Sequence, residues 1–494
     1  MYASAGLPVQ RMTDETGMED SGNWPDIVFR TKSGVKRGKM KLTVNDQGRV
    51  HADLRSALAE AHRDYIERNP NSLARHHEAC EAMPGGNTRT VLHNAPFPLT
   101  VVRGDGCRLY DADGHEYIDV LGEYTAGIYG HSHPVIRAAI DRALDQGWNY
   151  AGRNEYEVKF AKLIASRIPS IEQVRFTNSG TEANLMALAG ARAFAQRQGR
   201  TKATKVMIFG GGYHGGVLSF VGGESAVNVP YEYVVAPYND IEQTQALFAE
   251  HGDETFATLV EPMQGSHGCL PGDPGFLAVL REETKTRGIT LIFDEVMTSR
   301  LAPGGLQEKL GILPDMTTLG KYIGGGMSFG AFGGRRDVME LFDPTKPDSL
   351  SHAGTFNNNI LTMAAGLAGF GEVYTPEAAR VLNERGDRIR ERVNAICADA
   401  GVAFQFSGIG SIMTAQATTR PIRRAADIAT SNQDAKELFF LDMIAAGFWI
   451  ANRGFITLNI LIGDTEADQL VEAVDKFVST RRSLLTPKSH QLLS

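Results

Sequence analysis

One lysine in this sequence has a setting that favours chemistry over solvation. Lys321 follows a short apolar run and precedes three glycines, Gly324 to Gly326. Most lysines are solvated surface charges, so an apolar, glycine-rich context is unusual. Burial and nearby cations lower a lysine's pKa and yield a neutral amine that can attack a carbonyl carbon. The alternative, a phosphate-binding lysine, lacks support because no P-loop signature is present.

A carboxylate forms the second candidate group. Asp294 follows the β-rich run 289–293, which has no polar alternation and is therefore expected to be buried on both faces. A carboxylate at the carboxyl end of such a strand lies where α/β sheets place their ligands. A buried aspartate needs a cationic partner, and a protonated pyridine nitrogen is one. An N-cap role, or a metal site shared with Glu295, is the alternative, although no histidine is nearby.

The third group is a turn at residues 177–183, between a predicted strand and a predicted helix. Small residues let a ligand approach the backbone, and the first N–H groups of a helix bind phosphate well. The hydroxyls of Ser179 and Thr181 add donors. The alternative is an ordinary N-cap, in which Ser or Thr satisfies the first helical turn.

Two weaker features complete the set. Tyr213 lies within the glycine-rich stretch 211–216, where an aromatic ring could lie flat on a planar ligand, gaining ~1 kcal/mol from offset stacking. Thr355 lies in the polar stretch 354–358, which could reach a phosphate. The alternative for Tyr213, a core tyrosine, is hard to reconcile with so many glycines, and the Thr355 stretch is weak on its own.

Alternating strands and helices must position these residues. The residue pattern predicts strands at 174–176, 205–209, 256–260 and 289–293, with helices at 181–198 and 276–287. This alternation, with apolar strands, favours a mainly parallel sheet covered by helices. Earlier in the chain, a helix is predicted at 52–66 with a stop at Pro70, followed by short strands between 99 and 120. Later, helices at 377–400 and 465–481 flank a strand-like run at 455–459, which suggests a smaller α+β domain.

The length of the chain indicates more than one structural lobe. At 494 residues it exceeds the ~250–300 residues over which a single core grows. Residues 1–50 have no apolar period and are predicted to be a flexible tail, with a dimer-wrapping arm as the alternative. We expect the N-terminal part of a small domain at 51–125, a large domain at 126–370, and the C-terminal part of the small domain at 371–494.

Composition excludes several classes of protein. A net charge of −8 gives no footprint for nucleic acid. The four scattered cysteines, with no CxxC pair, predict neither a disulfide framework nor a zinc site and fit a cytoplasmic protein. No signal peptide and no apolar stretch of ~20 residues is present, so no membrane association is expected.

Taken in order along the chain, these motifs resemble the class III aminotransferases, which are pyridoxal-phosphate enzymes of fold type I. The resemblance covers roughly residues 75–480. Five strings match the family pattern: 177–183, 213–215, 261–262, 293–297 and 319–326. The fold it implies is α/β, with a mainly parallel central sheet in a large domain and a smaller α+β domain built from both chain ends.

The resemblance also implies roles at the ring of pyridoxal 5'-phosphate. Lys321 would hold the cofactor covalently and shuttle the proton. Asp294 would pair with the pyridine nitrogen. Val296 and Tyr213 would pack on opposite ring faces. The wall beside the ring hydroxyl would consist of Gln264 and Glu261.

For the phosphate, the resemblance implies a cradle shared between two subunits. Ser179, Gly180 and Thr181 would hold it from one chain, while Thr355 would reach the phosphate of the neighbouring subunit. A homodimer with shared active sites is therefore expected, and no metal is implied.

Two subgroups of the family compete. Glutamate-1-semialdehyde aminomutases share the Ser-Gly-Thr-Glu turn and the glycine run after the lysine. Aminotransferases of β-amino acids such as β-phenylalanine also match at 87–89, 95–100, 123–127, 298–303 and 356–359. That subgroup recognises substrate carboxylates with two arginines, which correspond to Arg89 and Arg453 in the matching strings 87–89 and 452–455. A guanidinium binds a carboxylate through two parallel bonds; outside the resemblance, each would be interpreted as a surface arginine.

The sequence therefore predicts an enzyme that transfers the amino group of a β-amino acid to a 2-oxo acid, such as 2-oxoglutarate or pyruvate, by ping-pong kinetics. The alternatives are the aminomutase and an aminotransferase of ω-amines or α-amino acids. A non-catalytic cofactor-binding regulator is disfavoured because Lys321 and Asp294 are both present and no DNA-binding segment is found.

Overall fold

The structure is a computed structural model that describes residues 53–223 and 225–487. Residues Asp53–Ser494 cluster as one compact unit. The predicted tail at 1–50 lies outside the described residues. The boundaries proposed at 125 and 370 remain predictions.

A seven-stranded sheet carries most of the predicted chemistry. Its strand order is β4-β12-β11-β10-β7-β5-β6, and all neighbours are parallel except β12, which is antiparallel to both β11 and β4. Six of the strands therefore end at the same edge of the sheet. The strands are β4 (Gln173–Thr177), β5 (Lys205–Phe209), β6 (Glu232–Ala236), β7 (Thr255–Val260), β10 (Thr290–Asp294), β11 (Met316–Gly320) and β12 (Gly330–Gly334).

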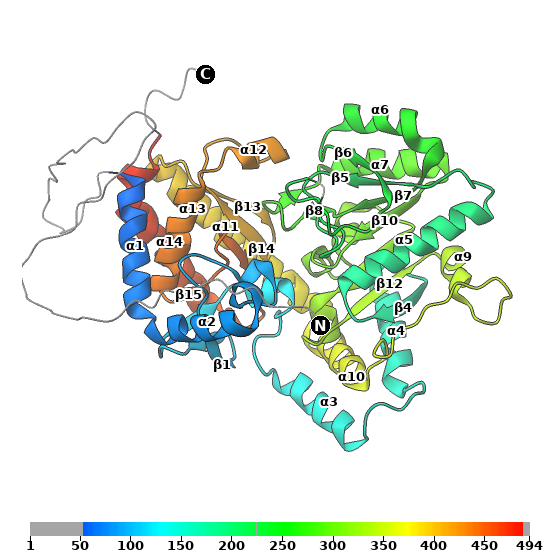
Figure 1. Ribbon diagram of the computed structural model, residues 1–494, viewed down its shortest axis with the longest axis horizontal. Helices are drawn as coiled ribbons and strands as arrows, with labels where there is room; N and C mark the ends of the chain where they lie inside the picture. The colour runs from blue at the N-terminus through cyan, green and yellow to red at the C-terminus, as the bar shows by residue number, and fades with distance from the viewer. Residues whose placement is uncertain (1–52, 224, 488–494) are drawn as a thin grey trace, which may run out of the picture. The chain divides into compact units, whose positions relative to one another are not determined.

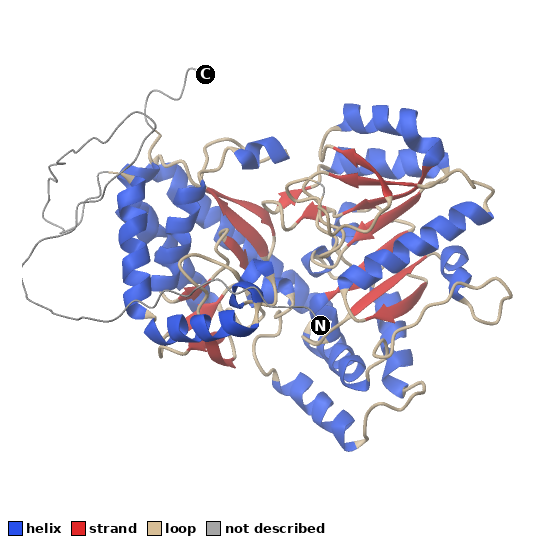
Figure 2. Ribbon diagram, in the orientation of Figure 1, coloured by secondary structure: helices blue, strands red, loops and turns tan. Residues whose placement is uncertain are grey.

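Helices cover both faces of this sheet, as Figure 2 shows. On one face, alanines of α5 pack against Val206, Ile208 and Ile292. On the other, Phe248 of α6 and Phe276 of α7 pack with the alternate strand residues. Because both faces are covered, β7, β10 and β11 are buried along their whole length. The helices near this sheet are α3 (Pro134–Asp145), α4 (Glu155–Arg167), α5 (Gly180–Arg197), α6 (Ile241–His251), α7 (Pro274–Arg287), α8 (Leu306–Leu310), α9 (Arg336–Met339) and α10 (Ile360–Ala368).

Local sequence sets where these helices begin and end. Ser179 caps α5, because its side chain accepts a hydrogen bond from the Glu182 N–H. Asp273 caps α7 in the same way, and Gly288 ends α7 in the left-handed conformation that glycine adopts without strain. The predicted helices at 181–198 and 276–287 are thus confirmed within a few residues.

The two chain ends share one of the smaller sheets. Strand β3 pairs in parallel with β15, so segments 51–125 and 371–494 meet in one sheet of order β1-β2-β3-β15. A second sheet has the order β13-β14-β16, and β8 pairs with β9. The strands are β1 (Val101–Asp105), β2 (Arg108–Asp111), β3 (Glu116–Asp119), β8 (Met263–Gln264), β9 (Leu270–Pro271), β13 (Gln405–Ile409), β14 (Ile412–Gln416), β15 (Phe448–Trp449) and β16 (Phe455–Thr457).

Helices from both chain ends accompany these sheets. In Figure 1, α1 (blue) lies beside α13 and α14 (orange to red), and α11 packs on α14. The helices are α1 (Leu54–Arg68), α2 (Pro70–Ala82), α11 (Pro376–Ala400), α12 (Ala425–Ala429), α13 (Gln433–Ala445) and α14 (Asp464–Leu485). Pro70 does end the first helix, but it also opens α2, which was not predicted; proline fits the first position of a helix because its missing N–H needs no partner there.

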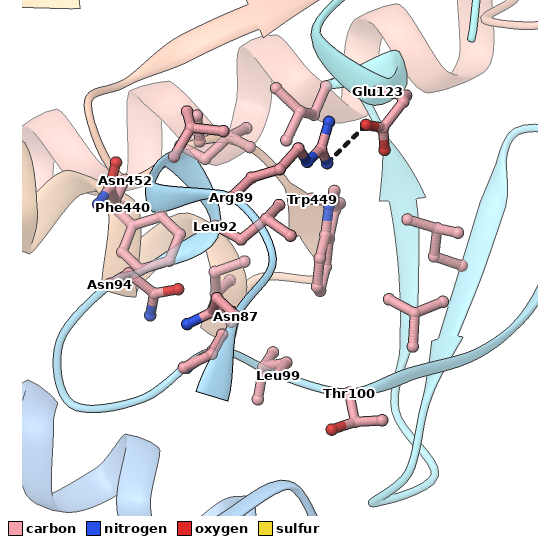
Figure 3. A pocket seen from close by; sticks show the side chains of 18 of the residues that line it. Asn87, Arg89, Leu92, Asn94, Leu99, Thr100, Glu123, Phe440, Trp449 and Asn452 are labelled. Carbon is pink, nitrogen blue, oxygen red and sulfur yellow. Dashed lines mark ion pairs between the residues drawn. The ribbon is translucent and has the colours of Figure 1, made fainter. Parts of the chain in front are cut away.

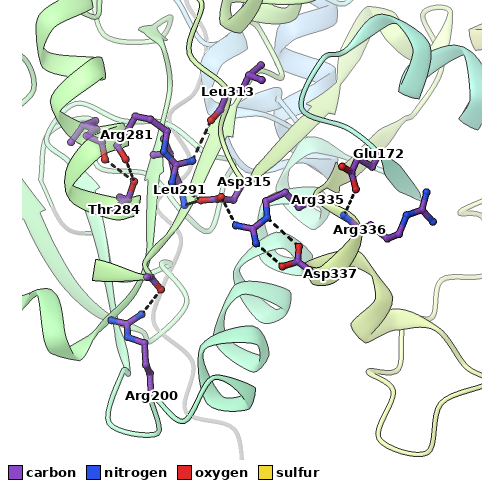
Figure 4. A network of polar contacts seen from close by, with 12 residues as sticks. Glu172, Arg200, Arg281, Thr284, Leu291, Leu313, Asp315, Arg335, Arg336 and Asp337 are labelled. Atoms are coloured by element: carbon purple, nitrogen blue, oxygen red, sulfur yellow. Dashed lines mark hydrogen bonds and ion pairs between the residues drawn. The ribbon is translucent and has the colours of Figure 1, made fainter. Parts of the chain in front are cut away.

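A network of ion pairs and hydrogen bonds around Asp315 links the strands at the ends that lie away from Asp294 and Lys321. Asp315, just before β11, accepts hydrogen bonds from the Leu291 N–H (2.9 Å), from Arg281 (3.0 Å) and from Arg335 (2.9 Å), as Figure 4 shows. This network ties α7, β10, β11 and the end of β12 together. It holds in register the strands whose other ends carry Asp294 and Lys321.

Candidate active site

Lys321 lies directly after β11, at the edge where the parallel strands end. Its Nζ donates a hydrogen bond to the Tyr124 carbonyl at 2.8 Å. Burial lowers the pKa of the amine to about 8, and the Asp294 carboxylate opposes that shift. The backbone has a φ of 54°, a conformation in which side chains are strained and which persists where the surroundings fix it, often at functional sites.

Asp294 is a buried carboxylate held by three donors. It accepts hydrogen bonds from the Val296 N–H (3.0 Å) and the Asn184 Nδ2 (2.8 Å), and its Oδ2 lies 2.8 Å from the His214 Nδ1. Thr318 in turn donates to the Asn184 Oδ1 at 2.7 Å, which fixes the orientation of that amide. The carboxylate is therefore held rigidly beside the strand ends.

Sequence reasoning missed Asn184 and His214 as site residues. Asn184 stands one turn into α5 on its alanine-rich buried face, and an isolated polar residue on such a face is a signal that could have found it. His214 follows Tyr213 in a string that was recognised, but only the tyrosine was assigned a role.

The turn at 177–183 is both an N-cap and part of a cradle. The Ser179 Oγ accepts from the Glu182 N–H at 3.2 Å, which leaves its own hydrogen free to donate. A Cβ on Gly215 would lie 2.0 Å from the Thr181 Oγ1, so the glycine-rich stretch closes on this turn. A Cβ on Gly180 would lie 2.8 Å from Val296, which brings the β10 end to the same place.

A second wall comes from the end of β7 and from β8. Glu261 is buried and accepts from the N–H groups of Tyr213 (2.9 Å) and Gly265 (3.2 Å). Burial raises the pKa of this carboxyl, and the nearby Asp294 adds to the rise. Gln264 donates to the Gly210 carbonyl at 2.9 Å, while its Oε1 is buried without a hydrogen-bond partner among the described residues. The Tyr213 side chain is 41% exposed, so it is no core tyrosine.

The two predicted carboxylate-binding arginines lie beside neighbouring residues, Arg89 beside Glu123 and Arg453 beside Tyr124. The guanidinium of Arg453 stands 5.4 Å from the Tyr124 ring and 5.0 Å from the Phe455 ring. Arg89 forms an ion pair with Glu123 at 2.7 Å, at the rim of a cavity of about 440 Å³ (Figure 3). Since the Tyr124 carbonyl also accepts from Lys321, residues 123 and 124 connect all three cations.

Thr355 stands apart from these groups within one chain. It lines a separate cavity of about 390 Å³ with residues 149–154. Asn357 of the same loop accepts a hydrogen bond from Asn178, next to the Ser179 cap, at 2.9 Å. The predicted reach of Thr355 into a neighbouring subunit stays a prediction.

Glu295 serves structure. It is buried and accepts hydrogen bonds from the Leu306 and Gln307 N–H groups and from the Thr298 hydroxyl. A metal site shared by Asp294 and Glu295 thus finds no support, and no group of three metal-ligating side chains occurs among residues 53–223 and 225–487.

Together these residues fit a planar, anionic aldehyde cofactor. They offer a covalent anchor in Lys321, a fixed carboxylate for a ring nitrogen in Asp294, and an 18-residue helix whose N-terminal N–H groups face the cradle. The orphaned Gln264 Oε1 lies near Gly211, where it could accept from a ring hydroxyl. Fold and site define a fold type I pyridoxal-phosphate transferase.

The chain belongs to the class-III aminotransferases, whose family profile matches residues 91–478. It is a pyridoxal-phosphate-dependent aminotransferase, as the motif order predicted. It is 51% identical to a β-phenylalanine transaminase of Variovorax paradoxus over 88% of this chain and 99% of that protein. A solved β-phenylalanine aminotransferase structure from the same organism has a TM-score of 0.86 at 50% identity, covering 88% of this chain and all of the other.

Two further relatives represent the alternatives that the sequence left open. A solved ω-transaminase of Sphaerobacter thermophilus is 36% identical, with a TM-score of 0.79 over 84% of this chain and 99% of that one. A glutamate-1-semialdehyde 2,1-aminomutase of Sorangium cellulosum is 38% identical over 78% of this chain and 90% of the relative.

Proposed function

We propose that this enzyme transfers the amino group of a β-amino acid, such as β-phenylalanine, to a 2-oxo acid. The observation that carries the proposal is the convergence of Arg89 and Arg453 on the adjacent residues 123 and 124. The carbonyl of Tyr124 also contacts the Lys321 amine. Both substrates of such a reaction carry a carboxylate, which a guanidinium binds through two parallel hydrogen bonds. The likeness to the Variovorax paradoxus transaminase supports the same substrate class.

The cofactor would be held by the residues already described. Lys321 anchors it, Asp294 pairs with the ring nitrogen, and Val296 and Tyr213 cover the two ring faces. Gln264 accepts from the ring hydroxyl, and Glu261 holds the backbone of that wall. The phosphate is bound by Ser179, Gly180, Thr181 and, from the neighbouring subunit, Thr355.

When bound, pyridoxal phosphate withdraws electrons from the amine-bearing carbon of the donor. The freed Lys321 amine would take the proton from that carbon and return it at the cofactor carbon that had carried the aldehyde. A pKa of about 8 suits this work, because a proton carrier is most effective near the operating pH. The Tyr124 carbonyl orients the freed amine, and Asp294, fixed by Asn184 and His214, keeps negative charge opposite the ring nitrogen.

The test is incubation of the purified enzyme with β-phenylalanine and 2-oxoglutarate, with glutamate formation as the measurement. We expect glutamate from β-phenylalanine, much less from α-phenylalanine or 1-phenylethylamine, and none with Lys321→Ala. Efficient use of 1-phenylethylamine, with Arg89→Ala nearly as active as wild type, would instead identify an ω-amine transaminase. Conversion of glutamate-1-semialdehyde without an acceptor would identify an aminomutase.

We further propose a cytoplasmic homodimer that binds neither nucleic acid nor membranes. The net charge of −8 and the scattered cysteines support this, and no helix in the described part of the chain is long and apolar enough to cross a bilayer. Light scattering after size-exclusion chromatography should give about twice the 53.7 kDa of one chain. Adding Lys321→Ala chains to Thr355→Ala chains should restore activity if the two subunits share their sites.

A further inference from the structure

A left-handed turn, residues Gly122–Thr125, lies beside the active site. Four successive residues have positive φ: 51° at Gly122, 46° at Glu123, 52° at Tyr124 and 83° at Thr125. Left-handed backbone strains a residue that carries a side chain, so such a run persists only where other contacts fix it. Here Asp119 accepts from the Gly122 N–H at 2.9 Å, and the Gly122 carbonyl accepts from the Gly127 N–H at 2.7 Å.

Two neighbouring residues of the turn each contact a basic side chain. The Tyr124 carbonyl meets the Lys321 amine, and the Glu123 carboxylate meets the Arg89 guanidinium. Figure 3 shows Glu123 and Arg89 facing one another across the cavity rim. Hydrogen bonds to both backbone groups of Gly122 fix the start of the turn, and the Glu123 that follows carries its carboxylate beside Arg89. Arg89 lies in the segment 84–92, which has only short 3₁₀ turns.

The ion pair between Arg89 and Glu123 is expected to be weak because both side chains are exposed to solvent. The side chains of Arg89 and Glu123 are 47% and 57% exposed, and the Arg89 Nη2 lies 2.7 Å from the Glu123 Oε1. Exposed pairs of this kind are easily broken because solvent screens them. A ligand carboxylate that meets the guanidinium through two parallel bonds would bind Arg89 better than Glu123 does.

We propose that Glu123 is the resting partner of Arg89 and that a substrate's carboxylate replaces it. This inference rests on the proposed function, in which Arg89 binds that carboxylate. Glu123 then competes with both carboxylate substrates, so it weakens the binding of donor and acceptor alike and speeds release of the keto acid. A ligand without a carboxylate leaves the pair intact. Glu123 is thus a residue that sets specificity through Arg89.

The test is the Glu123→Gln variant of the holoenzyme, which keeps shape and removes charge. Calorimetry with 3-phenylpropanoate, a β-phenylalanine analogue without the amine, should show binding about two- to five-fold tighter than wild type, the range that the loss of one exposed ion pair allows. The neutral 3-phenylpropanamide should bind both proteins equally. Glu116→Gln is the matched control, since Glu116 pairs with Arg108 at 2.8 Å with similar exposure and should leave both affinities unchanged.

The background variant Arg89→Ala isolates the link. There the additional Glu123→Gln change should alter neither affinity. Unchanged binding of the acid by Glu123→Gln, equal tightening for acid and amide, or a persistent effect in the Arg89→Ala background would each overturn the inference. The proposed function fails separately, if the wild-type enzyme makes no glutamate from β-phenylalanine, whatever the calorimetry shows.

Discussion

Burial of the Lys321 amine disfavours its charge, so the folded protein favours the neutral form. The folded pKa of about 8 lies below the ordinary value of 10.5, chiefly because burial disfavours the charge. Between those two values the unfolded chain binds more protons than the folded one. The stability contributed by this residue therefore rises with pH from about 8 to 10.5, and its destabilising effect is largest below pH 8.

We expect Lys321→Met to stabilise the cofactor-free protein at pH 7, by roughly 3 kcal/mol at most, because an apolar side chain of similar length replaces a buried ammonium. The difference from wild type should shrink as pH rises from 8 toward 10. Urea unfolding of both cofactor-free proteins across this range measures it. A difference that is constant with pH would contradict the lowered pKa.

Asn184 is expected to matter for both stability and cofactor binding. Asn184→Ala leaves the Asp294 carboxylate and the Thr318 hydroxyl each short of a partner in a buried place, which should cost about 1–3 kcal/mol. Affinity for pyridoxal phosphate, measured by titration of the cofactor-free protein, should fall as well. Asn239→Ala, which removes amide contacts to the Pro271 and Arg423 carbonyls, is the control and should leave cofactor affinity unchanged.

At the residue scale, the sequence predicted the site residues whose neighbours in the chain form a recognisable pattern. It missed contacts between residues that lie far apart in the chain. Lys321 and Asp294 stand at strand ends that their apolar neighbours make visible. Asn184 contacts Asp294, which lies 110 positions away in the sequence. Glu123 contacts Arg89 from a turn whose left-handed backbone cannot be predicted from its residue types. Such contacts depend on how the elements approach one another, which local patterns do not encode.

At the scale of elements, caps and apolar periods predicted the helices well, whereas β12 was missed. That strand contains three glycines and lacks the alternating side chains by which strands are recognised. Packing explains its composition: a Cβ on Gly330 would lie 2.1 Å from the Ser179 carbonyl, and one on Gly334 would lie 2.2 Å from the Asp315 carbonyl. Glycine lets β12 insert between its neighbours without displacing the cradle turn.

We therefore expect Gly330→Ala to destabilise the protein by at least about 1–3 kcal/mol, because the opposing backbone atoms cannot move aside. The displaced Ser179 should also weaken cofactor retention during dialysis. Gly152→Ala is the control, since its nearest neighbour would be 3.8 Å away and its φ is not in the left-handed range. Equal melting temperatures for the two variants would contradict this account.

At the scale of the whole molecule, the compact unit Asp53–Ser494 contains every residue assigned to the site. The family profile lies within it, and Asp53 itself caps α1 by accepting from the Ser56 N–H. We expect a chain that begins at Ala52 to fold, dimerise and keep the kcat/KM of the full-length protein. Loss of the dimer in that shorter chain would favour the alternative in which residues 1–50 wrap a partner.

The place of β12 between β4 and β11 also orders events during synthesis. β4 stands at the edge of the sheet, and β12 is its one neighbour there. The chain leaves the ribosome N-terminus first. β4, which leads into the turn at 177–183, therefore has no strand to pair with until Gly334 has emerged. By then Asp294 and Lys321 are already outside. β12 is thus the last strand of the large sheet to be synthesised, and β4 gains its neighbour in the sheet last.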